Sequence, residues 1–242
     1  GDNPSMAQQT ADPPTPKTRR RGRGVTFWLG LGLVVAGLAL LGYVGWQFFG
    51  TNIVAHGRQR EAVAQLQQDW REGPATTIGA KPGDPVKLGQ ATALIRIPRF
   101  GRDYVMPVFE GVGDDVLAKG FGHFEDAAQA GEKGNYALAA HRVTHGEPLR
   151  DMPKLRPGDK VIVETREDVF TYVLDTDPND LVVTFHDVWV VAPKPENPRA
   201  GGVGPADDPR LITLTTCSEL FHTDNRMIAF GHLLSKEPKP QA

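Results

Sequence analysis

The chain has 242 residues, of which 40% are hydrophobic and 23% are charged, and its formal net charge is −2. This length accommodates one domain of roughly 150 residues with extensions, and the charge balance shows no basic excess of the kind that binds nucleic acid. The single cysteine excludes an internal disulfide, and the 20 prolines and 27 glycines favour a loop-rich β protein over a helical bundle.

The N-terminal part predicts a membrane anchor. Residues 1–24 lack apolar periodicity and end in a basic cluster, so we expect a disordered tail. Residues 25–50 carry no charge, and about 20 apolar residues span a bilayer, so we predict a transmembrane helix. A cleaved signal peptide is the alternative, but its apolar core normally has only about 7–15 residues. The positive-inside rule predicts a cytoplasmic N-terminus, with everything after residue 50 outside.

Residues 51–89 are expected to form a juxtamembrane helix and a linker. Helix formers over 56–70 place Val63, Leu66 and Trp70 at a rough helical spacing. Residues 71–89 are rich in Gly, Pro and Thr, which is typical of a linker. Whether this linker covers a binding groove stays open at this point.

Residues 90–236 change to short β runs between turn residues, followed by a tail at 237–242. We expect eight strands, within residues 91–98, 104–111, 135–141, 160–167, 169–176, 180–193, 211–217 and 226–234. The segments 115–126 and 146–155 suggest short helices or turns. Because closure removes exposed sheet edges, this pattern predicts a mostly β fold built on a closed barrel.

Cys217 stands at the end of the run 211–217, where a thiol can face a groove. A free thiol has a pKa near ~8.5, so a catalytic cysteine needs a base or a cation nearby. The alternative is a small buried hydrophobic residue, which is what most free cysteines are.

His141 ends another apolar run, and adjacent strand ends would bring its imidazole to the same rim as Cys217. His145 lies in the loop that follows, and spacing alone does not choose between the two histidines. His123 and His222 are further candidates. His186 and His232 lie inside β-like runs, where we expect packed or surface positions.

Arg226 begins the last predicted strand. If that strand pairs antiparallel with the strand ending at Cys217, the two residues flank the connecting loop. A guanidinium keeps its charge, so it suits an oxyanion better than it suits proton abstraction. The alternative is a surface arginine paired with Asp224 or Glu219.

Three motifs together resemble the sortases, which are membrane-anchored cysteine transpeptidases of Gram-positive bacteria. They are TLTTC at 213–217, AAHR at 139–142, and an arginine at the start of the next strand. The resemblance covers about residues 91–235 and is most like class E, the housekeeping type of high-GC actinobacteria. Ala140 stands where the family more often has Gly. The fold implied is the sortase type of eight-stranded barrel.

The resemblance implies a mechanism. Cys217 would attack the Thr carbonyl of a C-terminal LAxTG-like sorting signal, cleaving it between Thr and Gly. His141 would act as general acid and base, and Arg226 would stabilise the oxyanion or hold the signal. The expected substrate-binding residues are Tyr104, Thr215 and Thr216, and a Tyr at position 104 is associated in class E with preference for Ala in the signal.

The partners implied are secreted proteins that carry such signals and the amino group of a lipid II-type peptidoglycan precursor. The expected location is the cell membrane, with a single span and the catalytic domain outside. We expect no cofactor and no metal, and we interpret the acidic side chains as parts of charged, solvated loops: Glu110, Asp114, Asp115 and Glu125.

Three other functions compete with this one. A membrane-anchored cysteine peptidase would use the same residues but release a free acid. A pilin-building class C or specialised class D sortase is a further alternative. However, the sequence Asp-Pro-Val at 84–86 lacks the aromatic residue of the Asp-Pro-aromatic lid motif of class C. A non-catalytic scaffolding barrel would bury Cys217 in its core.

Overall fold

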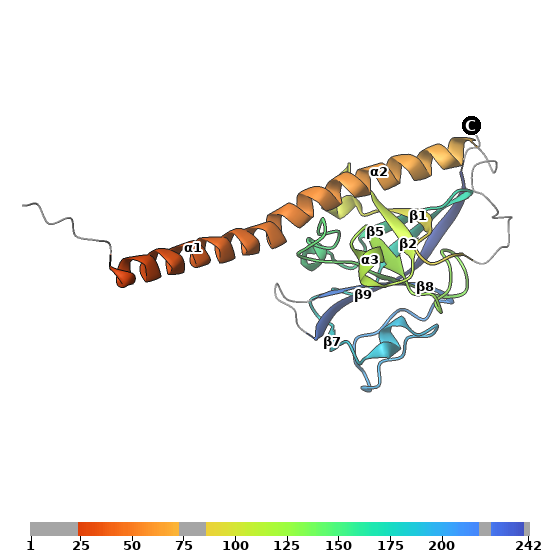
Figure 1. Ribbon diagram of the computed structural model, residues 1–242. Coiled ribbons are helices and arrows are strands. Elements are labelled where there is room, and N and C mark those ends of the chain that lie inside the picture. Colours follow the sequence, from red (N-terminus) through yellow and green to blue (C-terminus); the bar gives the residue numbers. More distant parts are fainter. Residues whose placement is uncertain (1–23, 73–85, 218–223, 240–242) are drawn as a thin grey trace, which may run out of the picture. The chain divides into compact units, whose positions relative to one another are not determined.

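The computed structural model describes residues 24–72, 86–217 and 224–239, with Cys217 described through its backbone. The chain divides after Val44 into two compact units (Figure 1). Several predictions concern residues outside these ranges: the basic tail, most of the linker including residues 84–85, Glu219 and His222.

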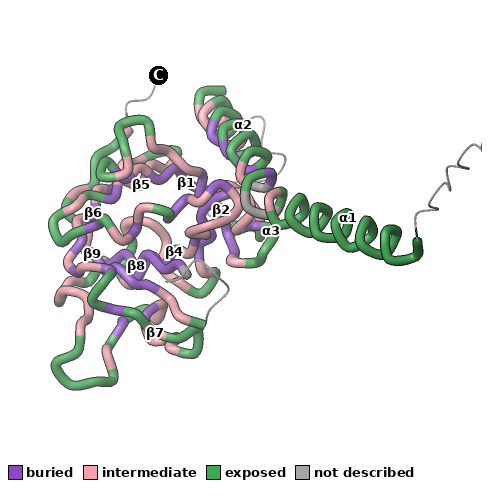
Figure 2. Tube along the Cα trace, turned by 90° about the vertical axis from the view of Figure 1, so that its left-hand side faces the viewer, coloured by how far each residue is buried: buried purple, intermediate pink, exposed green. Residues whose placement is uncertain are grey.

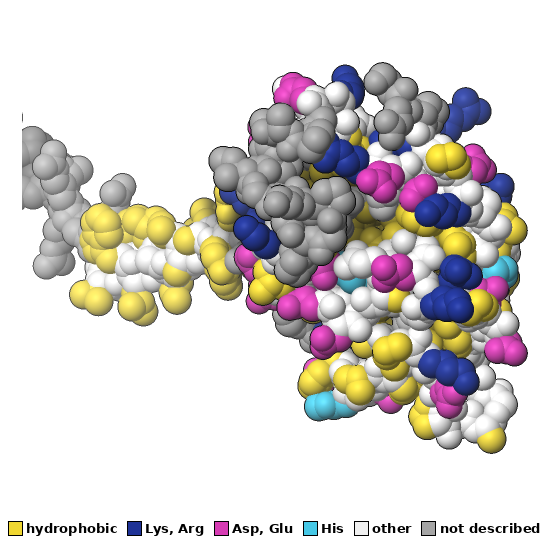
Figure 3. Space-filling model, turned by 90° about the vertical axis from the view of Figure 1, so that its right-hand side faces the viewer, with side chains coloured by type: hydrophobic (Ala, Val, Ile, Leu, Met, Phe, Trp, Pro, Cys, Tyr) yellow, Lys and Arg dark blue, Asp and Glu magenta, His cyan; other side chains and the backbone are white. Residues whose placement is uncertain are grey.

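The first unit contains all but the last residue of helix α1 (Val25–Gly45), which has 21 residues and a window of mean hydropathy 2.1. At about 1.5 Å per residue, it is as long as the roughly 30 Å hydrocarbon core of a bilayer. None of its residues is buried within the protein, so the helix is drawn as exposed in Figure 2, and its side chains are largely hydrophobic in Figure 3. By length and composition, α1 is able to cross a membrane.

The second unit opens with a π-helical turn, η1 (Trp46–Gly50), and helix α2 (Thr51–Glu72), which is longer than the helix expected over 56–70. Val63 and Leu66 of α2 are buried against Leu94, together with the half-buried Trp70. Burying an aliphatic side chain fully contributes about 1.5–3 kcal/mol, so this stripe holds α2 against the sheet. Buried and exposed residues alternate along the helix in Figure 2.

Eight strands close into a barrel. The sheet order is β6-β5-β1-β2-β3-β4-β8-β9-β7, and a further pairing of β6 with β9 closes the ring while β7 stays outside on β9. The strands are β1 (Ala91–Arg96), β2 (Met106–Glu110), β3 (Phe121–His123), β4 (Gly134–Ala139), β5 (Lys160–Glu164), β6 (Asp168–Leu174), β7 (Val182–Thr184), β8 (Arg210–Cys217) and β9 (Asn225–Pro238). The predicted mostly β, closed eight-stranded barrel is confirmed.

Side chains from the strands fill the barrel. The largest of these fully buried side chains include Tyr136, Tyr172 and Phe121. The Tyr172 hydroxyl accepts a hydrogen bond from the Gly131 amide at 2.7 Å, and burial raises the pKa of Tyr172 to about 12. The barrel interior is therefore a packed core, and a substrate has to bind at its surface.

Two segments differ from the strand prediction. The segment 180–193, expected as a strand, gives only the short outer strand β7 and a 3₁₀ turn, η4 (Val188–Val191). The segment 115–126, expected as a short helix or turn, contains most of helix α3 (Asp114–Leu117) but also barrel strand β3. β3 has three residues, too few to show an alternating pattern. A Cβ at its Gly122 would overlap the Gly111 carbonyl, so the strand depends on a close backbone approach.

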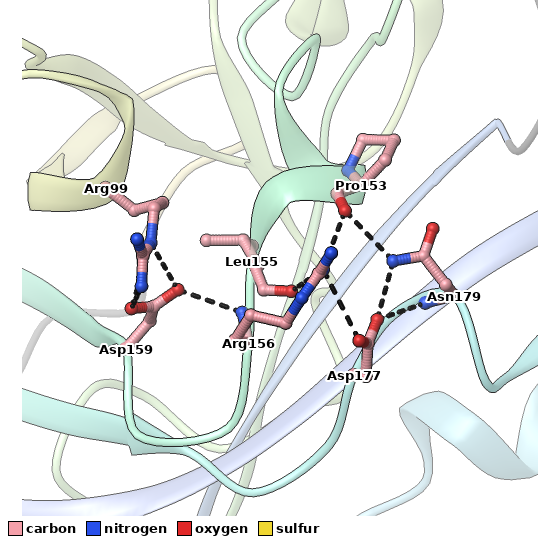
Figure 4. A network of polar contacts seen from close by, with 7 residues as sticks. All are labelled: Arg99, Pro153, Leu155, Arg156, Asp159, Asp177 and Asn179. Atoms are coloured by element: carbon pink, nitrogen blue, oxygen red, sulfur yellow. Dashed lines mark hydrogen bonds and ion pairs between the residues drawn. The ribbon is translucent and has the colours of Figure 1, made fainter.

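A polar network fixes the two remaining 3₁₀ turns, η2 (Pro98–Phe100) and η3 (Met152–Lys154). Arg99 donates to both oxygens of Asp159, and Arg156 binds the Pro153 carbonyl at 2.8 Å and Asp177 at 3.3 Å (Figure 4). The hydrogen bonds from Arg99 lower the pKa of the Asp159 carboxyl. The chain between η3 and β5 is therefore held by side chains.

Candidate active site

Strands β4 and β8 run parallel and end side by side. Ala139 pairs with Thr215 in the ladder, and the Ala140 amide donates to the Thr215 carbonyl at 3.2 Å. The buried Thr216 hydroxyl donates to the Ala140 carbonyl at 2.6 Å. Two more residues in this register bring the backbone of His141 beside that of Cys217. The expected adjacency of the two strand ends is thus present.

Strands β8 and β9 are antiparallel, and Cys217 pairs directly with Arg226. On its other side Arg226 pairs with Val183 of β7, so it lies in the middle of three strands. Its Nη1 donates to the Asn225 carbonyl at 3.0 Å. The ladder therefore fixes the backbone of Arg226 opposite Cys217, as the sequence analysis expected.

Residues 141–149, which follow β4, form what we call the histidine loop. The Leu149 amide donates to the His141 carbonyl at 3.0 Å and closes the loop at its base. The rings of His141 and His145 stack, with centroids 4.8 Å apart and planes 29° apart. His145 and Glu147 are the non-glycine residues of the described chain that have a positive φ, at 55° and 50°. This backbone is strained and needs support from its surroundings.

Helix α2 contacts the histidine loop through two side chains. The Asn52 amide nitrogen donates to Glu147 at 2.9 Å, and its oxygen accepts from the Gly146 amide at 2.9 Å. The Gln59 side chain donates to the His145 carbonyl at 3.0 Å. Neither residue was predicted from the sequence, because a polar side chain on a helix does not indicate which distant loop it binds.

Tyr104 contacts the same loop from the segment before β2. Its hydroxyl donates to the Pro148 carbonyl at 2.6 Å, and its ring packs edge-on against Phe100. Burial raises the pKa of Tyr104 well above its usual value, as does the charge of Asp151, so the hydroxyl stays a donor. Tyr104 also lines a groove of about 360 Å³ between α2 and residues 103–106.

Substrate binding by Tyr104, Thr215 and Thr216 stays a prediction. Thr215 and Thr216 are 7% and 3% exposed. The Tyr104 hydroxyl connects the segment before β2 to the histidine loop, and the Thr216 hydroxyl connects β8 to the residue after β4. Both residues thus have a structural role in addition to any contact with substrate.

The other described histidines lie in different surroundings. His123 is fully buried, with Nδ1 3.0 Å from Glu110 and Nε2 3.0 Å from the Ala128 carbonyl. Both ring nitrogens are thus engaged away from the ends of β4 and β8. The interpretation of Glu110 as a solvated loop residue was wrong, because it ends β2, is 4% exposed and binds this imidazole. His186 is exposed, and His232 is 2.7 Å from Asp175.

Within residues 24–72, 86–217 and 224–239, no group of three or more His, Cys, Asp or Glu side chains is arranged to hold a metal ion. A second pocket, of about 320 Å³, is lined by residues that include Gln129, Glu132, Phe170 and Lys236. Its lining contains none of the predicted site residues, so it does not belong to the candidate active site.

The sortase domain family model matches residues 95–234 of this chain. The chain belongs to the sortase family. It is 35% identical to sortase SrtE1 of Streptomyces coelicolor over 233 residues, which cover 92% of this chain and 62% of that protein. The chain therefore spans less than two thirds of the length of this sortase.

Solved sortase structures show the same fold. Sortase E from Streptomyces avermitilis is 41% identical, with a TM-score of 0.55, and the match covers 64% of this chain and 97% of that one. Sortase E1 from Streptomyces coelicolor, solved with a tripeptide in the active site, is 34% identical with a TM-score of 0.53, over 63% and 95% of the two chains. These likenesses confirm the predicted resemblance to sortases of the class E type.

Proposed function

We propose that this sortase is a cysteine transpeptidase that cleaves a C-terminal LAxTG-like sorting signal between Thr and Gly. It then joins the Thr carboxyl group to an amino group of a cell-wall precursor. The observation that best supports this proposal is the register of β4, β8 and β9. In it Cys217 pairs with Arg226, and Ala139, two residues before His141, pairs with Thr215, two residues before Cys217. Family membership adds to it, since sortases as a family are cysteine transpeptidases.

In this mechanism Cys217 attacks the Thr carbonyl carbon, and a tetrahedral oxyanion forms. His141 gives a proton to the leaving Gly amine as the thioester forms, and it accepts a proton from the incoming amine in the second half-reaction. Arg226 cannot lose its charge, so it supplies positive charge to the oxyanion in both half-reactions. Atoms balance, because one peptide bond breaks and one new amide bond forms.

The proposed partners are secreted proteins with LAxTG-like signals and a lipid II-type amine. We assign α1 as a single membrane span with the N-terminus in the cytoplasm and the barrel outside. The basic cluster that precedes α1 supports this orientation through the positive-inside rule. The tripeptide in the active site of sortase E1 from Streptomyces coelicolor supports a peptide as the substrate.

Mass spectrometry tests this proposal. The full chain in detergent micelles is incubated with an LAxTG peptide, with and without an amine such as oligoglycine or a diaminopimelate mimic. We expect a Cys217 acyl adduct that the amine converts to a peptide–amine product, and no adduct in Cys217→Ala. Free acid alone, with the amine present, would show a peptidase instead. An unmodified Cys217 and an intact peptide would contradict the proposed substrate.

A further inference from the structure

Helix α2 carries one polar residue in the stripe that it buries. The stripe consists of Ala55, Gln59, Val63 and Leu66, which are 3%, 2%, 9% and 8% exposed, and of the half-buried Trp70. These positions recur every three or four residues, which is the spacing of one helix face. Any apolar side chain at position 59 would continue this face, so the choice of Gln needs a reason outside helix packing.

Gln59 makes a hydrogen bond to the histidine loop that an apolar side chain could not make. Its Nε2 donates to the His145 carbonyl, and the direction of this bond is fixed because a carbonyl can only accept. Its buried Oε1 has no hydrogen-bond partner among the described residues. A buried unpartnered acceptor is costly, so the net benefit of Gln59 lies in what it does for the histidine loop.

The loop is shaped to receive Gln59. Gly146 has a φ of +80°, and a Cβ at this position would lie 2.5–2.8 Å from the Gln59 amide group. The residues on both sides of Gly146 hold a positive φ without being glycine. Strain of this kind persists only where the surrounding structure imposes it.

The other supports of the loop come from two directions. Asn52 binds Gly146 and Glu147 from the start of α2, and Tyr104 binds the Pro148 carbonyl from the segment before β2. The far end of α2 is fastened separately, because Lys239 lies 3.9 Å above the Trp70 ring and bonds to Glu164 at 2.6 Å. Helix α2 therefore has its own attachment to the barrel and can act as a fixed support.

We propose that α2 is a positioning element of the active site, and that Gln59 is the positioning residue that sets the His141 imidazole through the histidine loop. The inference rests on the proposed function in that His141 is the acid and base. The path is short: Gln59 holds the His145 carbonyl, the His145 ring stacks on the His141 ring, and the base of the loop closes on the His141 carbonyl. Gln59 touches neither substrate nor a reacting atom.

The test compares three α2 variants of the full chain in detergent micelles. Gln59→Met keeps length and packing but removes the donor. Gln65→Met makes the same change at an exposed position of the helix. Val63→Ala weakens the packing of α2 and leaves the Gln59 contact in place. Three quantities are measured: kcat and KM for peptide–amine formation, the melting temperature, and the pH profile of Cys217 alkylation by iodoacetamide.

Gln59→Met is expected to lower kcat by about 10- to 100-fold with little change in KM, because a histidine displaced by about 1 Å is a poor proton donor. Its alkylation profile is expected to shift in pH, since the ionisation of Cys217 depends on the neighbouring imidazole. Gln65→Met should match the unsubstituted chain, and Val63→Ala should lower the melting temperature without shifting the profile.

The inference is overturned if Gln59→Met keeps the kcat and the alkylation profile of the unsubstituted chain. It is overturned equally if Val63→Ala reproduces both changes, because α2 would then act through stability alone. The alkylation profile needs no sorting signal. If the unsubstituted chain fails to process the peptide, the proposed function fails, while the profile still decides the role of Gln59.

Discussion

The ends of β4 and β8 differ from the histidine loop in what fixes their backbone. The strand ends are held by a continuous parallel ladder, six residue pairs long, and by the Thr216 hydroxyl on Ala140. The loop has no ladder, and side chains from α2 and from the segment before β2 hold it instead. The hydrogen bonds of a ladder join backbone groups, so a change of side chain does not remove them. A contact that holds the loop is lost when its side chain is replaced.

This difference divides the site into a rigid part and a supported part. Cys217 and Arg226 pair in the antiparallel ladder of β8 and β9, and His141 follows the parallel ladder of β4 and β8, where the histidine loop begins. Substitutions on the ladder side should change chemistry or stability, and those on the loop side should change how well the imidazole is aligned. The predictions below test this division.

The largest effect is expected from the two stacked histidines. His141→Asn should lower kcat/KM by about 10²- to 10⁴-fold, which is the usual contribution of a general acid and base. His145→Asn should cost far less, because Asn tolerates the positive φ of this position and keeps the carbonyl that Gln59 binds. Steady-state kinetics of peptide–amine formation measures both. Equal losses would mean that His145 shares the chemistry.

A smaller effect is expected at Thr216. Thr216→Val removes the donor to the buried Ala140 carbonyl, which should cost about 1–3 kcal/mol of unfolding free energy. It should also lower kcat by about tenfold, because Ala140, the residue before His141, loses the hydrogen bond that holds its carbonyl. Denaturant unfolding and steady-state kinetics measure the two.

Thr213→Val is the matched control on the same strand. It removes a buried hydroxyl whose single hydrogen is shared between the Asn135 side-chain oxygen and the Val190 carbonyl, four residues before Cys217. It should lower stability comparably and leave kcat alone. A similar kcat for both variants would show that Thr216 does not affect catalysis through its hydrogen bond to Ala140.

The smallest effect is expected in the network that follows the histidine loop. Because Arg99 lowers the pKa of Asp159 below its ordinary value of 3.8, the folded state favours the ionised carboxyl. The stabilisation is present above that value and is lost as the pH falls through the lowered pKa. The difference in unfolding free energy between the unsubstituted chain and Asp159→Asn should therefore be constant near neutral pH and shrink in acid.

Unfolding titrations over this pH range check the expectation. Asp126→Asn, which makes the same substitution at an exposed position, serves as the control. A difference that grows as the pH falls would mean that Asp159 is not held ionised by Arg99. Activity at neutral pH should change little, because the network lies beyond η3.

The sequence could predict the barrel and the ladder side of the site, because both depend on strand patterns. The runs ending at His141 and Cys217 are long enough for their C-terminal ends to be predicted from the sequence. β3 was missed because three residues carry no period, and the segment 180–193 was mistaken for a strand because its apolar run folds mostly into a 3₁₀ turn and loops.

The contacts of the histidine loop could not be predicted from the sequence. Spacing left His141 and His145 undecided, and the stack of their rings depends on a backbone with two positive φ values. The Gln59 contact joins residues 86 positions apart, and the pair of Glu110 with His123 forms only when β2 and β3 align. Such contacts follow from tertiary structure, and local composition does not encode them.

The central claim is that the ladder brings His141 beside Cys217, and thiol cross-linking tests it most directly. Since Cys217 is the one cysteine of the chain, His141→Cys introduces a single second thiol. We predict that dibromobimane, which fluoresces when both of its arms react, links the two thiols within one molecule. His232→Cys is the control, because His232 pairs with Leu211, about 20 Å along β8 from Cys217. A linked His232→Cys, or an unlinked His141→Cys with both thiols still reactive, would contradict the account.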